Sequence, residues 1–282
     1  MIIFDYQQIA ISNLMEQIGS SKVSVDETLV RHMILNTIRT YVKKYKDSHG
    51  PEVIIACDNR HYWRREIFQH YKAGRKKARD SSGHDWPSIF DCLGKIKQEL
   101  KDSSPYKVID VDTCEADDII AVLAMKFSST QKVMILSSDK DFAQLQKFPN
   151  VEQYSPILKK NIKEPLPAAQ LKQLIIRGDK SDGIPNILSK DDTFVEGARQ
   201  KPITEAKIIN WMNQAPEEFC TDEMLRNFKR NEMLIDLTKI PEALKTSILD
   251  TYETAKGKTR QEFMNYMIAN RLKNLIEVID EF

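Results

Sequence analysis

One stretch of the sequence, residues 108–144, constrains the fold more than any other. It contains a short apolar run at 108–111, an apolar segment of helical length at 119–127 and a second short apolar run at 132–136. Short apolar runs that alternate with helical segments predict buried parallel strands joined by helices. Acidic residues follow both runs and open the helix, so they would lie at the carboxyl edge of a sheet, where open α/β proteins form their sites.

The same alternation covers the first half of the chain. Apolar runs at 1–4 and 53–57 predict two more buried strands, and residues 151–163 predict a small strand or hairpin. Helices are expected at 9–17, from 24 or 26 up to the Gly50-Pro51 break, and at 88–100, 168–176, 204–212, 222–237 and 241–282. The fold class is therefore α/β, with a central mostly parallel sheet flanked by helices on both faces and a smaller C-terminal helical subdomain.

Two consecutive domains are predicted. Residues 1–164 form the first and contain a basic segment at 60–80. Residues 165–282 form the second, which is helical and contains a helix-turn-helix-like segment at 168–212.

Acidic side chains collect at the ends of the predicted strands. They are Asp5, Asp58, Glu115, Asp117, Asp118, Asp139 and Asp141, and Asp179 and Asp182 form a further pair. A single aspartate in such a place is often only a helix cap or a turn residue, and acids in a first helical turn can merely complement the helix dipole. At least four strand ends, however, carry acids toward one edge, and converging carboxylates repel one another unless cations lie between them. Hard divalent cations bound through oxygen, Mg²⁺ first among them, are therefore expected rather than a solvated acidic rim.

Two clusters of acids indicate two metal ions, which can activate a water and steady the leaving oxygen of a phosphodiester. No Ser/His/Asp or Cys/His pattern and no GxxxxGK[ST] motif competes with this interpretation. An aspartyl-nucleophile phosphatase would need a second acid two residues after Asp5, where Gln7 stands. Phosphodiester hydrolysis is the reaction that suits a carboxylate-only metal site.

Bases and aromatic rings alternate between residues 60 and 79. Arg65, Lys72, Lys76 and Arg79 fall near one helical face. A basic run is often only a solvated face, but this one directly follows Asp58, a candidate metal ligand. Because aromatic rings can stack on bases while cations bind phosphates, the segment is predicted to contact nucleic acid.

Composition adds few constraints. The 282 residues carry a net charge of +1, so the bulk charge alone does not indicate nucleic acid, whereas the distribution of charge does. Four scattered cysteines form no CxxC pair and indicate reduced thiols. No apolar run approaches the length of a membrane span and no basic leader precedes the first strand, so a cytoplasmic location without membrane association is expected.

Five motifs, in order along nearly the whole chain, carry a resemblance. They are FDYQQIAIS, CDNRHYWRREIFQHYKAGRKKAR, DTCEADDIIAVL, ILSSDKDFAQL and IIRGDKSDGIPNI. Together they resemble the flap endonuclease and 5′-3′ exonuclease family, most closely its phage-encoded ribonuclease H branch. The resemblance implies a PIN-like α/β fold, two Mg²⁺ ions with Mn²⁺ as a substitute, and structure-specific 5′ nuclease activity. It further implies removal of RNA primers and 5′ flaps in lagging-strand DNA replication, in a bacterial host if the chain is phage-encoded.

The resemblance also assigns roles to individual residues. The acids implied for the first metal are Asp5, Asp58, Glu115, Asp117 and Asp139, and those on the second-metal side are Asp118, Asp141, Asp179 and Asp182. Catalytic roles are implied for Arg64, Lys72, Asp117 and Asp139, with both bases over the scissile phosphate beneath a helical arch. Contacts to nucleic acid are expected from Tyr62, Arg64, Arg65, Tyr71, Lys72, Arg75, Lys76, Arg79, Lys190 and Lys207, with Tyr71 where the family often stacks a nucleobase.

The chain departs from the family after Asp182. Many relatives continue with GIGxKTA, a glycine-rich hairpin that holds duplex phosphates, often with a K⁺ ion. Here residues 183–187, GIPNI, lead into LSKDD instead. The segment 168–212 is still expected to bind duplex, through Lys190, Arg199, Lys201 or Lys207, and a K⁺ ion there is an open alternative.

The expected substrates are 5′-flap, nicked and RNA–DNA duplexes, and the expected protein partner is a sliding clamp or a single-strand-binding protein. The chain itself is expected to be a monomer. Residues 275–282 are either a docking segment for such a partner or an ordinary helix end. The alternative function is a catalytically weak nucleic-acid-binding module of the same fold. The complete set of acids argues against it, because a binder gains nothing from negative charge near phosphates.

Overall fold

The computed structural model describes residues 1–19 and 24–282, which divide into two compact units. We call residues 1–60, 84–163 and 242–282 the sheet unit, and residues 61–83 and 164–241 the helical unit. The predicted domains are consecutive in sequence, whereas these units are not. The basic segment groups with the C-terminal helices, and the end of the chain returns to the sheet.

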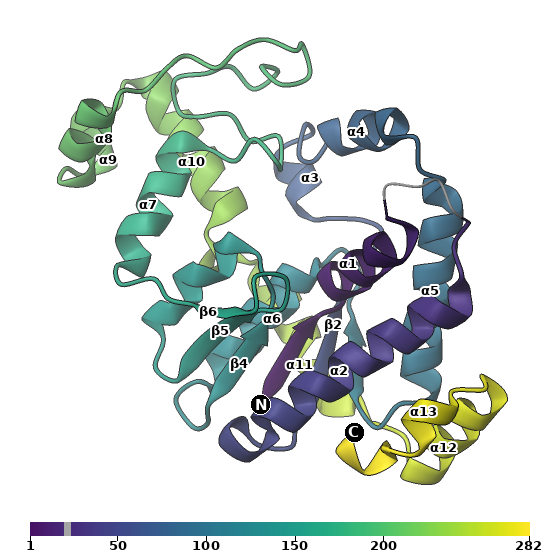
Figure 1. Ribbon diagram of the computed structural model, residues 1–282. Helices are drawn as coiled ribbons and strands as arrows, with labels where there is room; N and C mark the ends of the chain where they lie inside the picture. The colour runs from purple at the N-terminus through teal and green to yellow at the C-terminus, as the bar shows by residue number, and fades with distance from the viewer. Residues whose placement is uncertain (20–23) are drawn as a thin grey trace. The chain divides into compact units, whose positions relative to one another are not determined.

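A six-stranded sheet, in the order β3-β2-β1-β4-β5-β6, forms the centre of the sheet unit among the described residues (Figure 1). The strands are β1 Ile2–Asp5, β2 Val53–Cys57, β3 Lys107–Asp110, β4 Val133–Leu136, β5 Val151–Ser155 and β6 Lys160–Ile162. Strands β1 to β5 are parallel, and the edge strand β6 pairs antiparallel with β5. The four predicted strands, the predicted hairpin and the mostly parallel sheet are confirmed.

Helices cover both faces of this sheet (Figure 1). On one face lie α1 Tyr6–Ile18, α2 Glu27–His49, α5 Trp86–Ser103 and α12 Arg260–Ala269, and on the other lie α6 Ala116–Phe127 and α11 Glu242–Thr254. Shorter helical segments are η1 Lys140–Lys147, α13 Lys273–Ile276 and η3 Ile279–Glu281. No helix among the described residues is long and apolar enough to cross a membrane.

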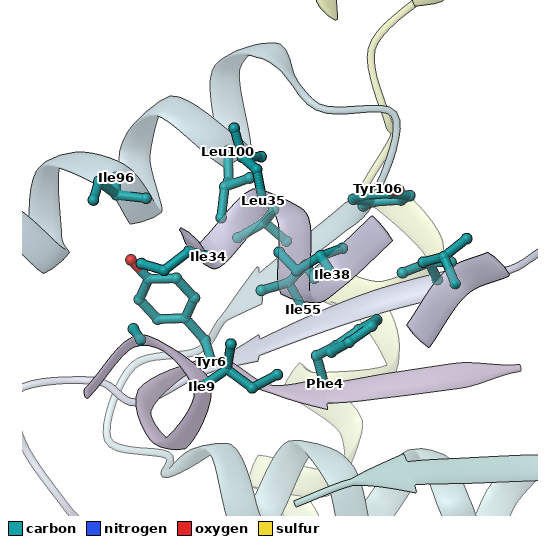
Figure 2. Close-up of a cluster of buried hydrophobic side chains, with 14 of the residues drawn as sticks. Phe4, Tyr6, Ile9, Ile34, Leu35, Ile38, Ile55, Ile96, Leu100 and Tyr106 are labelled. Carbon is teal, nitrogen blue, oxygen red and sulfur yellow. The ribbon is translucent and has the colours of Figure 1, made fainter. Parts of the chain in front are cut away.

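Apolar side chains on both faces of the sheet form two apolar layers, one under the helices of each face. Phe4 and Ile55 belong to the apolar cluster under α2, where Figure 2 shows them near Ile34 and Ile38. Their neighbour Ile3 points to the opposite face, because successive side chains of a strand alternate. Every position of β1 is therefore buried, as expected for a central parallel strand covered on both faces. Asp5 is the last residue of this buried strand.

The end of the chain packs on the sheet unit. Leu275 and Ile279 are buried in the same apolar cluster, and the ring of Phe282 meets a ring of α12 edge-on at 5.1 Å. The Glu281 carboxylate pairs with Arg39 of α2. Of the two interpretations of residues 275–282, the structure favours an ordinary helix end, since the apolar side chains are in the core rather than exposed for docking.

The helical unit is built around its own apolar cluster, formed mainly by α7, α8 and α10. Its helices are α3 Arg64–Ile67, α4 Gly74–Ser82, α7 Pro167–Arg177, α8 Glu205–Met212, α9 Pro216–Phe219, α10 Asp222–Ile235 and η2 Leu237–Lys239. The helices predicted at 168–176, 204–212 and 222–237 are confirmed. The single helical face expected for the basic segment is wrong. A turn separates α3 from α4, and in it Lys72 has φ 56°, a left-handed conformation that a right-handed helix cannot contain.

Candidate functional site

Four neighbouring strands of the sheet lead into acids. In the spatial order β3, β2, β1, β4, the chain continues from each strand to Glu115, Asp58, Asp5 and Asp139. Because these strands are parallel, their carboxyl ends lie at one edge of the sheet. The parallel direction of the strands thus brings acids from four separate parts of the sequence to one edge of the sheet, as predicted.

Asp5 occupies the centre of this edge. It is 6% exposed and caps α1, with Oδ1 accepting a hydrogen bond from the Gln8 N–H at 3.1 Å and Oδ2 one from the Ser137 hydroxyl at 2.9 Å. Burial and then the Asp58 carboxylate raise the pKa of Asp5 to about 7, with a smaller contribution from Asp139, although the two hydrogen bonds act in the opposite direction. The neighbouring carboxylates therefore disfavour the charged form of Asp5, which is the condition that a bound cation would relieve.

The acids after β2 and β3 also hold the start of α6. Asp58 Oδ1 accepts a hydrogen bond from the Ala116 N–H at 2.7 Å, and Asp118 Oδ2 accepts one from the Glu115 N–H at 2.9 Å. Glu115 and Asp118 are both buried. These acids thus stabilise the start of α6, which is an ordinary role for acids at a helix start, and they also belong to the acidic edge. Asp117, in the first turn of α6, is half-buried.

Asp139 follows β4 and caps η1, where its Oδ1 accepts a hydrogen bond from the Asp141 N–H at 2.9 Å. The buried Gln153 of β5 fixes the backbone here, since its Nε2 donates to the carbonyls of Ser137 at 3.0 Å and Asp139 at 2.7 Å. Sequence reasoning missed Ser137 and Gln153. A polar residue within a strand, as at Gln153, is the signal that could have indicated the second of them.

The donor set at this edge consists of carboxylates, the oxygen ligands that hard divalent cations prefer. Within residues 1–19 and 24–282, no three aspartate, glutamate, histidine or cysteine side chains are grouped so that they could hold a metal ion. One oxygen each of Asp5, Asp58 and Asp139 is engaged in a capping hydrogen bond. The chemistry of the donors and the raised pKa of Asp5 fit a cation. The individual metal ligands stay a prediction.

Asp179 and Asp182 belong to the helical unit, in the turn after α7. Asp179 is buried and accepts hydrogen bonds from its own turn. Asp182 lies among the residues of the basic segment, with Oδ1 2.7 Å from Arg75 Nη2 and Oδ2 3.8 Å from Lys72 Nζ. The Tyr71 hydroxyl donates to the same Oδ2 at 3.2 Å. In this structure Asp182 therefore orients the predicted nucleic-acid contacts.

Three residues predicted to touch nucleic acid are buried. Arg64 is 2% exposed, with its Nε donating to the Leu234 carbonyl at 2.9 Å, and Tyr71 and Lys72 are 2% and 7% exposed. At the side-chain positions observed, all three expose little surface, and their contacts with nucleic acid stay predictions. Lys72 Nζ lies over the ring of Tyr62 at 5.5 Å and over that of Tyr71 at 5.0 Å, which holds its charge in place.

The other bases predicted to contact nucleic acid reach the surface. The exposed ones are Arg65, Arg75, Lys76, Lys190 and Lys207, and Arg79 is half-buried. Tyr62, the remaining predicted contact, is half-buried as well. All of them lie in the helical unit. Their exposure is compatible with phosphate contact, and the contacts themselves stay predictions.

A central, mostly parallel sheet with acids along one edge is the arrangement expected of a PIN-like α/β nuclease, and comparison with known proteins places the chain within that class. Residues 13–173 match the N-terminal resolvase-like domain of 5′-3′ exonucleases, and residues 167–282 match the C-terminal domain of T4 RNase H. The chain is 37% identical over 292 residues to the ribonuclease H of Enterobacteria phage T4, across 99% of this chain and 95% of that protein. It therefore belongs to the 5′-3′ exonuclease and flap endonuclease family, as the resemblance predicted.

Further relatives agree with this assignment. The flap endonuclease Xni of Colwellia psychrerythraea is 34% identical over 131 residues, which are 44% of this chain and 42% of that protein. The zinc-bound structure of the T5 5′-exonuclease matches with a TM-score of 0.63 at 17% identity, over 91% of this chain and 99% of that one. A T5 D15 flap endonuclease structure with DNA and metal ions matches with a TM-score of 0.62 at 16% identity, over 90% and 99%. The PIN-like fold is confirmed, and the chain is an enzyme of the 5′-3′ exonuclease and flap endonuclease type.

Proposed function

We propose that this enzyme is an Mg²⁺-dependent, structure-specific 5′ nuclease that removes RNA primers and 5′ flaps from duplexes during lagging-strand DNA replication. The observation that carries the proposal is the row of acids at four neighbouring strand ends, where burial and Asp58 raise the pKa of Asp5 to about 7. The name of the T4 relative, ribonuclease H, supports an RNA-containing substrate. The T5 D15 flap endonuclease structure, solved with DNA and metal ions, supports the binding of DNA and of metal ions.

The residues proposed to hold the first ion are those at the sheet edge: Asp5, Asp58, Glu115, Asp117 and Asp139. Asp118 and Asp141 are proposed for the second ion, and Asp179 and Asp182 of the helical unit stay predicted ligands. Bound Mg²⁺, or Mn²⁺ in its place, would neutralise the phosphodiester and lower the pKa of a water. The chain's own residues fix the geometry. Ser137 and Gln153 hold the carboxylate of Asp5 and the backbone of Asp139, so the edge is preorganised before substrate binds.

The bases supply the remaining charge. Lys72 is fixed by Asp182 and by two aromatic rings, so it can act as a preorganised positive charge toward a phosphate with little reorganisation. The exposed bases of α4 are proposed to bind the phosphates of the strand to be cut. A sliding clamp or single-strand-binding protein is the proposed partner, and the enzyme is proposed to act as a monomer.

The alternative function is a nucleic-acid-binding module with weak catalysis. One gel separates the two functions, with 5′-labelled flap, nicked and RNA-primed duplexes incubated with the enzyme in Mg²⁺ and in EDTA. The proposal predicts short labelled products from the flap and RNA-primed duplexes in Mg²⁺ and intact substrate in EDTA. Tight binding of all three duplexes without cleavage would support the binding module instead.

A further inference from the structure

A row of polar side chains on α10 faces the interior of the helical unit. Asn227 and Asn231 are only 1% and 0% exposed, and the side chain of Arg230 is 8% exposed. Arg230 and Asn231 follow Asn227 by three and four residues, so all three residues lie on one face of the helix. Polar side chains buried this deeply cost stability unless their donors find acceptors.

The acceptors are backbone carbonyls, three of them in the loop that follows α7 and one in the last turn of α7. Asn227 Nδ2 donates to the carbonyls of Ile187 at 3.0 Å and Ser189 at 3.3 Å. Asn231 Nδ2 donates to the carbonyl of Pro185 at 2.9 Å and to a carbonyl in the last turn of α7 at 2.8 Å. Two side-chain amides thus fix four carbonyls around the start of the loop.

Arg230 adds a charge to this arrangement. Its Nη2 donates to the Pro185 carbonyl at 3.0 Å, and its Nε and Nη2 donate to Asn231 Oδ1 at 3.0 and 2.8 Å. The guanidinium also pairs with Asp191, which lies in the loop itself. A fixed cation therefore lies between the loop carbonyls and a loop carboxylate.

A potassium ion does not fit these residues. Proteins bind K⁺ through oxygens, backbone carbonyls prominent among them. Here the Pro185 carbonyl already accepts two hydrogen bonds, from Asn231 and Arg230, and the carbonyls of Ile187 and Ser189 each accept one from Asn227. A second cation beside the Arg230 guanidinium would also be repelled by it.

We propose that the side chains of Asn227, Arg230 and Asn231 hold the loop 185–201 in its duplex-binding form, so that this enzyme needs no potassium ion there. The loop carries three exposed bases, Lys190, Arg199 and Lys201. The three residues on α10 are positioning residues, since they act on the nucleic acid only through the loop. The inference rests on the proposed function because it takes a nucleic-acid duplex as the ligand of the loop.

The first experiment measures the affinity of the wild-type enzyme for a 5′-flap duplex with Ca²⁺ in place of Mg²⁺. The monovalent salt is KCl, NaCl or tetramethylammonium chloride at one ionic strength. The inference predicts dissociation constants equal within about threefold, because counterion release depends on salt concentration rather than on a particular cation. An affinity in KCl that exceeds the others by more than this factor would overturn it.

The second experiment uses Asn231→Ala, with Asn13→Ala as the matched control. Asn13 is also a buried asparagine, but its Nδ2 donates to the Ile9 carbonyl of its own helix in the sheet unit. Asn231→Ala should weaken duplex affinity about tenfold, because releasing the loop lowers the population of the binding form. Amide exchange should quicken in residues 185–201 and stay unchanged in the sheet unit. Asn13→Ala should leave both the affinity and the exchange of the loop unchanged.

The exchange measurement needs no nucleic acid, so it separates two kinds of failure. If the wild type binds no flap duplex in any salt, the proposed function is wrong. If the wild type binds but Asn231→Ala leaves both affinity and loop exchange at wild-type values, the positioning role is wrong. Should Asn231→Ala fail to fold, Arg230→Lys, which keeps the charge and loses the forked hydrogen bonds, replaces it with the same expected outcomes.

Discussion

Removing the charge of Asp5 should stabilise the metal-free enzyme at neutral and alkaline pH. The pKa of Asp5 is about 7 in the folded protein, against an ordinary value of 3.8, because of burial and then of Asp58. The folded state therefore binds the proton more tightly than the unfolded state does. The stability that this tighter proton binding gives the folded state is fully present below pH 3.8 and is lost as the pH rises through about 7. Each pKa unit corresponds to about 1.4 kcal/mol, so the loss is up to about 4 kcal/mol.

An Asp5→Asn variant carries no such titration. In EDTA, its free energy of unfolding should exceed that of the wild type by up to about 4 kcal/mol at pH 8, and by little at pH 4. The hydrogen bonds that the carboxylate accepts from Gln8 and Ser137 would reduce this gain somewhat where the amide replaces them less well. Urea unfolding followed by circular dichroism across this pH range measures the difference, with the exposed Asp112→Asn as control. Parallel pH profiles for wild type and Asp5→Asn, or a variant less stable at pH 8, would refute the reasoning.

Three further predictions concern the bases. Affinity for a flap duplex should fall by about 10²-fold or more between about 50 and 200 mM salt through counterion release, and a flat titration would exclude the exposed bases as the contact surface. Lys72→Ala should slow single-turnover cleavage by about 10²–10³-fold with a modest loss of affinity, whereas Lys76→Ala should mainly weaken binding. Equal losses of rate and affinity for Lys72→Ala would contradict its catalytic role. Arg64→Ala should lower the free energy of unfolding by about 2 kcal/mol by removing the hydrogen bond to the Leu234 carbonyl, while Arg65→Ala, at an exposed neighbouring position, should leave it unchanged in thermal denaturation. Equal stabilities of the two variants would show that the buried contact of Arg64 contributes little.

The sheet and its acidic edge could be predicted because their signals are local. Each of the strands β1 to β4 is a short apolar run that ends near an acid, as at Phe4-Asp5 and Leu136, which lies shortly before Asp139. The strand order itself was not needed, since parallel strands bring their carboxyl ends to one edge in any order. The capping bonds of Asp5 and Asp139 were also foreseeable, because an acid just before a helix ordinarily accepts from its first turn.

Contacts between distant segments could not be predicted in the same way. Lys72 adopts a positive φ although it is not a glycine, so its left-handed conformation has no sequence signal. The burial of Arg64 depends on a carbonyl 170 residues away, and Asn231 reaches carbonyls 46 and 56 residues away. Residues 242–282 return to the sheet unit through apolar side chains such as Ile279, which have ordinary helical periodicity and no mark of their partner.

The claim that the acidic edge catalyses metal-dependent cleavage is tested most directly by Asp139→Asn beside the wild type. The measurement is single-turnover cleavage of a 5′-labelled flap duplex in Mg²⁺, with thermal denaturation of both proteins and Asp112→Asn as the control for an exposed acid after β3. We expect rapid release of a short labelled product by the wild type and Asp112→Asn, and almost none by an Asp139→Asn protein that is folded and at least as stable in EDTA. Near-wild-type turnover by a folded Asp139→Asn, or no cleavage by the wild type in Mg²⁺, would contradict it.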